Sequence, residues 1–169
     1  MIVPRSHEHC LLSTYEWTGV HPPSLKVRIE TFLAGVQEGK TPHLLLSGST
    51  GIGKTHVGIG AYRRTVGSIS PACIWLNVPQ FCDRLQESPG GALWRDYERA
   101  TRLVVLDDLF GREAVAQDQI VARLLDTAYL NNAALLVTMC DGVQELSARM
   151  SRHAITRLLA DATIIPMRA

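Results

Sequence analysis

The 169-residue chain lacks a strong net charge, because its 17 lysines and arginines nearly balance its 16 aspartates and glutamates. Without a basic excess there is no global field that attracts nucleic acid, so such a contact has to come from a local patch or an assembled oligomer. Hydrophobic residues make up 46% and charged residues 20%, as in an ordinary soluble globular protein. This length suits one domain that buries a stable core without disulfide bonds or structural metal ions.

The chain also lacks paired cysteines. Its four cysteines, Cys10, Cys73, Cys82 and Cys140, form no C-x-x-C pair, so neither a zinc motif nor a redox motif is indicated. Cys73 and Cys82 stand among apolar residues and are interpreted as small core residues. This usage fits a reducing cytosol.

Targeting and membrane signals are missing as well. The first ten residues, MIVPRSHEHC, have no apolar core of a signal peptide, and no stretch approaches the roughly 18 apolar residues of a membrane span. We find no internal repeat and no low-complexity tract. The sequence therefore predicts a cytoplasmic protein without a membrane partner.

Short apolar runs alternate with helical patterns along the chain. Residues 1–23 are expected to be irregular, since Pro4, Pro22 and Pro23 discourage regular structure, and residues 24–169 to form the domain. Strands are predicted over 43–48, 73–78, 103–108, 134–139 and 162–167. Helices are predicted over 25–36, 55–66, 79–87, 92–100, 114–130, 143–150 and 154–160. Uniformly apolar strands between helices indicate an α/β fold, a parallel five-stranded sheet covered on both faces.

A phosphate-binding motif follows the first predicted strand. Residues 48–55 match G-x-x-x-x-G-K-[ST] in full: Gly48, Ser49, Thr50, Gly51, Ile52, Gly53, Lys54 and Thr55. The glycines let several backbone N–H groups point inward at phosphate oxygens, and the helix start adds its positive end. Lys54 is expected to reach the β- and γ-phosphates and Thr55 to bind magnesium, and the adjoining His56 is included in the nucleotide site.

The third predicted strand ends in two acids, in LVVLDDLFG. Asp107 is expected to hold Mg²⁺ directly or through water, and Asp108 to polarise the attacking water. An acidic strand end is a weak motif alone. It becomes a more specific one because it follows the phosphate-binding loop, or P-loop, of residues 48–55 by about fifty residues. Capping of the next helix by Asp108 is the structural alternative.

These segments, with LLVTMCDGVQEL and ARMSRHAITRL, resemble the AAA+ ATPases of the DnaC helicase-loader and IstB transposition-helper group over nearly the whole chain. The resemblance implies a three-layer P-loop fold that binds and hydrolyses ATP with Mg²⁺ in DNA replication or transposition. It also implies a replicative helicase or transposase as partner. Adenine is inferred from the resemblance alone, and residues 3–15 are expected to lie over the base.

The resemblance assigns further residues near the end of the chain. The sensor-1 element corresponds to Thr138-Met139-Cys140, where the usual Asn is replaced by Cys140, which puts the rate of hydrolysis in doubt. An arginine inserted into a neighbouring subunit's site corresponds best to Arg157, with Arg149 and Arg152 as nearby candidates. This implies a homo-oligomer, while a solvated arginine on a helix face is the alternative.

The segment at about 78–102 corresponds to the part of the family that faces single-stranded DNA. Trp94, Arg95, Tyr97 and Arg99 interleave aromatic rings with cations, which suits base stacking and phosphate contact. An ordinary amphipathic helix with Trp94 and Tyr97 in the core is the alternative. Members of this family commonly begin with an extra segment that binds the partner, and the chain is expected to have little before residue 3. It is also expected to lack a helical lid domain, so no sensor-2 arginine is assigned.

Two other functions remain open. A small-molecule P-loop kinase needs a second pocket and an arginine-bearing lid, for which we see no suitable insertion. A non-hydrolysing nucleotide-dependent scaffold is suggested by Cys140 at the sensor position and by the short side chain of Asp108.

Overall fold

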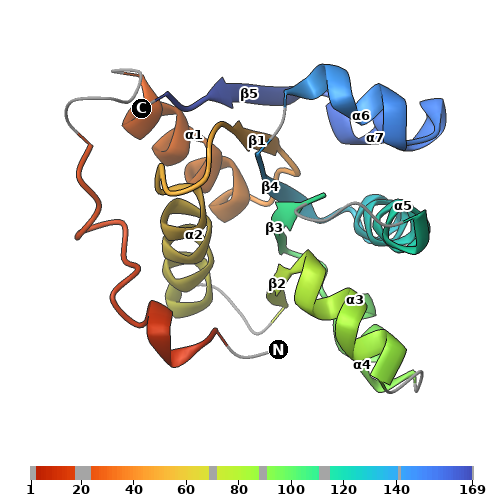
Figure 1. Ribbon diagram of the computed structural model, residues 1–169. Helices are drawn as coiled ribbons and strands as arrows, with labels where there is room; N and C mark the ends of the chain where they lie inside the picture. Colours follow the sequence, from red (N-terminus) through yellow and green to blue (C-terminus); the bar gives the residue numbers. More distant parts are fainter. Residues whose placement is uncertain are drawn as a thin grey trace.

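The computed structural model describes residues 3–17, 24–68, 72–87, 91–110, 115–140 and 142–168 (Figure 1). The strands are β1 (His43–Ser47), β2 (Cys73–Asn77), β3 (Leu103–Leu109), β4 (Ala134–Met139) and β5 (Ala162–Pro166). The helices are the short 3-10 helix η1 (Arg5–His7), α1 (Leu25–Gln37), α2 (Lys54–Ser68), α3 (Val78–Glu87), α4 (Ala92–Glu98), α5 (Val115–Leu130), α6 (Val143–Arg149) and α7 (Arg152–Leu159).

The five strands form one parallel sheet in the order β2-β3-β4-β1-β5. Every residue of β1 and β4 is buried, which explains why these segments are apolar without a polar alternation. The edge strand β5 is largely exposed, with Ile165 as its buried residue. Because all strands run the same way, their carboxyl ends share one edge of the sheet, where α/β proteins bind ligands.

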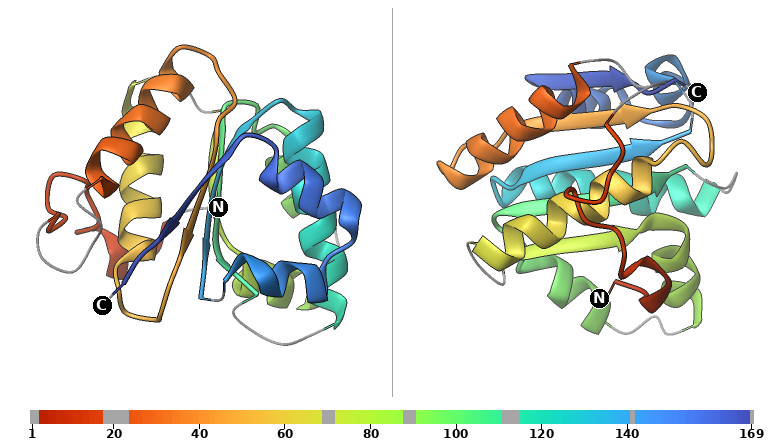
Figure 2. Two further views of the ribbon diagram at one scale, coloured as in Figure 1. Left: turned by 90° about the horizontal axis from the view of Figure 1, so that it is seen from above. Right: turned by 90° about the vertical axis from the view of Figure 1, so that its left-hand side faces the viewer.

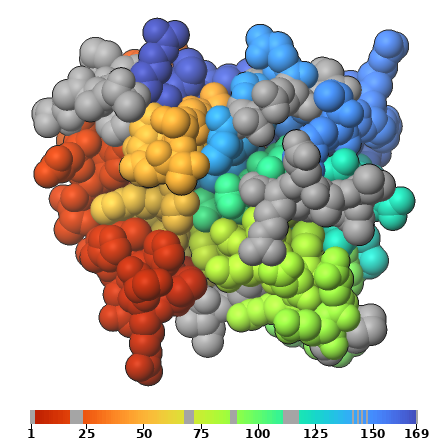
Figure 3. All heavy atoms as spheres, in the orientation of Figure 1, coloured from red at the N-terminus to blue at the C-terminus, as the bar shows by residue number. Residues whose placement is uncertain are grey.

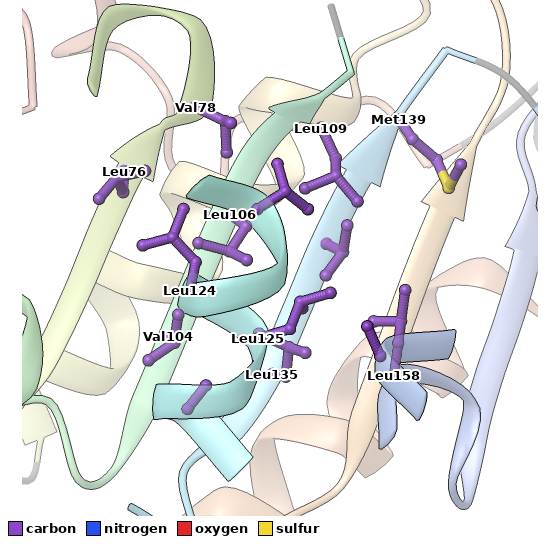
Figure 4. Packing of buried hydrophobic residues seen from close by; sticks show 14 of the residues in the cluster. Leu76, Val78, Val104, Leu106, Leu109, Leu124, Leu125, Leu135, Met139 and Leu158 are labelled. Atoms are coloured by element: carbon purple, nitrogen blue, oxygen red, sulfur yellow. The ribbon is translucent and has the colours of Figure 1, made fainter. Parts of the chain in front are cut away.

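Helices cover both faces of the sheet. In Figure 2, α1 and α2 lie on one side and α5, α6 and α7 on the other. The first side packs residues such as Ile29 and Ile59 against the sheet. The second side contains Leu106, Leu124 and Leu158, part of the leucine-rich core drawn in Figure 4. The predicted three-layer α/β fold is therefore confirmed.

The N-terminal segment, residues 3–17, crosses the outer surface of α2 (Figure 2) and forms one side of the molecule (Figure 3). A side chain at Gly60 would come within 2.9 Å of the backbone nitrogen of Leu12, so the segment approaches α2 more closely than a larger residue allows. Arg63 on α2 donates to the carbonyl of Glu8 at 2.6 Å. The segment is thus docked on the helix that follows the P-loop.

The predicted elements agree with the observed ones to within about two residues at each end. The segment expected to be irregular contains one short helix, η1, and turns in its described part. Among the described residues, no helix combines the length and the apolar character that crossing a bilayer requires.

Candidate functional site

A cavity of about 820 Å³ opens at the carboxyl ends of β1, β3 and β4. The predicted residues Thr50, Gly51, Gly53, Lys54, Thr55, His56, Asp107, Asp108 and Thr138 all line it. Cys140 also lines the cavity. Segments some ninety residues apart in sequence thus meet in one space of the size that nucleotide-sized ligands occupy.

The P-loop joins β1 to α2 through glycines in the left-handed region. Gly48 has φ 145° and Gly53 has φ 95°, values that side chains rarely allow. A β-carbon at Gly48 would lie 2.3 Å from the carbonyl oxygen of Met167, and one at Gly53 would lie 2.8 Å from the ring of Tyr15. Only glycine therefore lets this loop fit between β5's end and the N-terminal segment.

Lys54 is buried at the start of α2, with its ammonium group turned onto the loop. Its Nζ donates to the carbonyl oxygens of Gly48 at 2.6 Å and of Ser49 at 2.7 Å. These bonds satisfy a charge that is only 7% exposed. The ammonium is thus held within the loop, at the wall of the cavity where phosphates would lie.

Asp107 is the centre of a buried hydrogen-bond network. Its Oδ1 accepts from the Thr55 hydroxyl at 3.0 Å and from the Thr138 hydroxyl at 2.7 Å. The Thr138 oxygen in turn accepts from the backbone N–H of Asp108 at 2.9 Å. The P-loop, β3 and β4 are therefore joined through three side chains, which gives Thr138 a structural reason to be at the end of β4.

Burial raises the pKa of Asp107 above its ordinary value of 3.8. Hydrogen bonds from Thr138, Thr55 and Asn77 oppose this shift, and the neighbouring Asp108 adds to it. A carboxylate that is costly to ionise in the empty site is stabilised by a bound cation. The arrangement is suited to cation binding.

The oxygen pair of Thr55 and Asp107 fits Mg²⁺. An octahedral ion about 2.0–2.1 Å from its ligands places adjacent ligand oxygens about 3 Å apart. Thr55 Oγ1 and Asp107 Oδ1 are 3.0 Å apart, and both are the hard oxygen donors that Mg²⁺ prefers.

A β-bulge brings the two aspartates to the same side. Neighbouring residues of a regular strand point to opposite faces, but the β3–β4 register shifts between Leu106 and Leu109. Asp108 has φ 61° at this irregularity, and both Asp107 and Asp108 line the cavity. Asp108 lies inside β3, well before α5 begins at Val115, so the alternative that it caps this helix is wrong.

Cys140 follows β4 and faces both acidic and P-loop groups. Its Sγ lies 3.5 Å from Thr50 Oγ1 and 3.9 Å from Asp108 Oδ1. A thiol donates and accepts hydrogen bonds more weakly than the amide of asparagine. The thiol therefore contacts both groups but binds them more weakly than an asparagine amide at this position would.

Two residues had no motif that singled them out in the sequence: Asn77, which lines the cavity, and Tyr15, which contacts the lining residues Gly53 and His56. Tyr15 of the N-terminal segment packs on Gly53, and its ring lies 5.2 Å from that of His56. Asn77 at the end of β2 accepts from the N–H of Gln80 and so begins α3. Hydrophobic periodicity cannot reveal such residues, although a polar residue ending a buried strand, as Asn77 does, is a usable signal.

The predicted DNA-facing residues separate into two groups. Tyr97 is fully buried, and its hydroxyl donates to the carbonyl of Leu124 at 2.7 Å. Trp94 packs edge-on against Phe81 and is covered by the guanidinium of Arg123. Both aromatics belong to the core layer, as the amphipathic-helix alternative predicts, while Arg95 and Arg99 are exposed.

The three candidate arginines of α6 and α7 also differ. Arg157 is ion-paired with Asp126 of α5 and lies over the ring of Tyr129. Arg149 is 3.0 Å from Asp118 and lies over the ring of Phe110. Arg152 is exposed at the start of α7. None of the three lines the cavity of its own chain.

No protein-family model matches the chain, and no curated protein sequence matches it. Solved structures match its fold. The DnaC helicase loader aligns with a TM-score of 0.81 and 18% identity over 98% of this chain and 100% of that chain. DnaI aligns with a TM-score of 0.78 and 18% identity, over 99% of this chain and 95% of that chain.

A third structure, the replication initiator DnaA bound to AMPPCP and single-stranded DNA, aligns with a TM-score of 0.72 and 16% identity. The alignment covers 96% of this chain and 50% of that one. At such identities the likeness shows the fold alone, a parallel α/β sheet arranged as in these three structures. The resemblance drawn from the sequence motifs is confirmed at this level.

Proposed function

We propose that this chain is an ATP-hydrolysing AAA+ protein of DNA replication or transposition, similar in action to a helicase loader. One observation supports this most directly. The P-loop, the paired aspartates of β3 and Thr138 of β4 converge on a single cavity through a shared hydrogen-bond network. Binding of a nucleoside triphosphate and activation of water require these groups together.

The phosphates would lie against the P-loop backbone and the start of α2. There Lys54 exchanges its bonds to the carbonyls of Gly48 and Ser49 for phosphate oxygens, which are stronger acceptors because they are charged. Bound Mg²⁺, held by Thr55 and Asp107, supplies positive charge that offsets the charge of the phosphate chain. Ser49, Thr50, Gly51 and Ile52 complete the loop around them.

Asp108 is the proposed water-orienting residue. The bulge turns its carboxylate to the same cavity as Asp107, and Thr138 fixes its backbone N–H. A carboxylate there accepts a hydrogen bond from water and directs the water's lone pair at the γ-phosphate. His56, next to Thr55, lies at the cavity wall near the N-terminal segment.

Oligomerisation and DNA contact are further parts of the proposal. AMPPCP and single-stranded DNA are bound by the DnaA structure that shares this fold. Among the described residues, no arginine of α6 or α7 lines the chain's own cavity, and we assign Arg157 as the arginine that a second copy contributes to neutralise phosphate charge. Exposed Arg95 and Arg99 are the proposed phosphate contacts for DNA, without stacking by Tyr97.

Phosphate release tests this proposal. We expect slow hydrolysis by the wild-type chain that increases with protein concentration and with single-stranded DNA. Asp108→Asn is expected to abolish hydrolysis while ATP still binds, because the P-loop and Asp107 are unchanged. Loss of ATP binding in this variant, or unchanged hydrolysis, would contradict the role of Asp108. The ATP-trapped variant is also the bait with which to capture a helicase or transposase.

A non-hydrolysing scaffold is the second candidate, favoured by the thiol of Cys140 beside Asp108 and Thr50. Cys140→Asn restores the family's usual residue and discriminates between the two. A rise in hydrolysis from zero would identify the natural protein as a scaffold, while a modest increase over a measurable rate would identify it as a slow ATPase. Phosphorylation of an added nucleoside would instead indicate a kinase.

A further inference from the structure

Three side chains suited to binding a transition metal meet where the N-terminal segment contacts α2. One ring nitrogen of His9, one of His56 and the sulfur of Cys10 lie within 4.8 Å of one another. We propose that these residues form a Zn²⁺ site that fastens the N-terminal segment to the helix of the P-loop. Nitrogen and sulfur ligands in this combination are those that Zn²⁺ binds in proteins.

The separation between the Cys10 and His9 ligands is close to that of a tetrahedral site. Zn–N distances near 2.0 Å and Zn–S distances near 2.3 Å place adjacent N and S ligands about 3.6 Å apart. The Cys10 sulfur lies 3.7 Å from Nε2 of His9. The His9 side chain is exposed and free to make the small adjustment that the third ligand requires.

His56 is held in an orientation typical of a zinc-binding histidine. Its Nε2 lies 2.9 Å from the carbonyl oxygen of Leu11, and a carbonyl can only accept, so Nε2 carries the proton. The lone pair of the ring is then on Nδ1. Metal-binding histidines commonly donate their other ring N–H to a backbone carbonyl in this way, which fixes the ring and its tautomer.

The backbone around the other two ligands is also fixed without metal. The N–H of Cys10 donates to the carbonyl of His7 at 3.0 Å, and the Thr14 hydroxyl donates to the carbonyl of His9 at 2.9 Å. Arg63 holds the carbonyl of Glu8 at 2.6 Å. Because these bonds already order the segment, little conformational entropy remains to be lost when the metal binds.

The site joins two segments that are 46 residues apart, which is why no cysteine spacing in the sequence indicates it. It adjoins the proposed nucleotide site, since His9, Cys10 and His56 all line the same cavity, and a test without nucleotide therefore separates metal binding from ATP binding. With three protein ligands, a fourth position remains for water. Bound zinc is therefore expected to hold the N-terminal segment against α2 and to stabilise the folded chain.

Metal titration of the full chain, stripped with a chelator and free of nucleotide, tests the site. Co²⁺ serves as the spectroscopic probe, and Zn²⁺ affinity is measured by competition with a chromophoric chelator. We expect one equivalent to bind with a thiolate-to-cobalt charge-transfer band. Cys10→Ser is expected to remove the band, whereas Cys140→Ser, which alters a thiol elsewhere in the cavity, is expected to retain it.

His9→Ala provides a variant that folds, because its side chain is exposed. Loss of a metal's second-shell partner already weakens binding by about 10–100-fold, so loss of this ligand is expected to weaken Zn²⁺ binding about 100-fold or more. The matched control is His153→Ala, an exposed histidine of α7. Sub-stoichiometric binding by the wild type, a band that survives Cys10→Ser, or wild-type affinity in a folded His9→Ala would each overturn the proposal.

Discussion

The P-loop cluster, formed by Lys54, Asp107 and Thr138, is buried in the cavity wall. Arg149 of α6 and Arg157 of α7, by contrast, lie partly exposed beside α5. Lys54, Asp107 and Thr138 are all less than a tenth exposed and are hydrogen-bonded within the cavity wall. Arg149 and Arg157 instead pair with aspartates of α5 at partly exposed positions. The proposed nucleotide site is therefore held together by hydrogen bonds within one chain, whereas Arg149 and Arg157 are paired with α5.

The difference has a physical consequence for assembly. A buried polar network is costly to break, because each unpaired group keeps its desolvation penalty. Ion pairs at partly exposed positions contribute about 0–1 kcal/mol and exchange partners easily. In the proposed oligomer, Arg157 is thus able to leave Asp126 for a phosphate bound to a neighbouring copy, while the P-loop cluster stays in place.

The largest effect on the proposed nucleotide site is expected from Lys54→Ala. Removing two charge-assisted bonds to phosphate, about 1.5–3 kcal/mol each, is expected to weaken ATP binding about 100-fold or more. Titration calorimetry with and without Mg²⁺ measures the loss. Lys40→Ala, at an exposed lysine paired with Glu38, is the control and is expected to bind like the wild type. Equal binding by both variants would place the phosphates away from the loop.

Thr138→Val tests whether the network is structural. The variant leaves the Asp107 carboxylate without one donor and the Asp108 N–H without its acceptor, which is expected to cost about 1–3 kcal/mol of unfolding free energy. Chemical denaturation measures this cost. Thr138→Ser keeps the hydroxyl and is expected to lose much less. A loss in Thr138→Val no larger than that in Thr138→Ser would contradict a structural role for the hydroxyl.

Asp107→Asn tests the cost of the buried carboxylate. Because burial raises the folded-state pKa above 3.8, ionisation destabilises the empty folded state as the pH rises from 3.8 through the folded pKa. The asparagine variant is therefore expected to melt higher than the wild type at pH 7, with the difference shrinking toward pH 4. It is also expected to lose Mg²⁺-dependent nucleotide binding. A lower melting temperature at pH 7 would contradict the sign of this shift.

The smallest expected effect on stability concerns Arg157 and Asp126. Arg157→Ala and Asp126→Ala each remove the same ion pair, at a cost of about 1 kcal/mol or less. Their ATPase activities at high protein concentration should differ. If Arg157 acts in trans, Arg157→Ala lowers the rate and Asp126→Ala, which frees the arginine, does not. An equal loss of ATPase activity in both variants would indicate that Arg157 only stabilises its own chain.

Much of the fold was predictable because its signals are local. Apolar runs such as 134–139 marked strands that are buried on both faces, and the P-loop spacing predicted residues that the structure brings to one cavity. The position of Tyr97 in the core was not decidable from the sequence, because interleaved aromatic and arginine residues suit both a stacking surface and an amphipathic helix.

The sequence by itself determined the α/β order, the P-loop and the acidic end of β3, since each depends on residue type and spacing along the chain. Only the tertiary structure decided that Asp107 and Asp108 face one cavity, because a bulge overrides strand alternation. It also decided that Arg157 pairs with Asp126 and that His9 and Cys10 meet His56. These are contacts between distant segments, and chain packing alone sets their geometry.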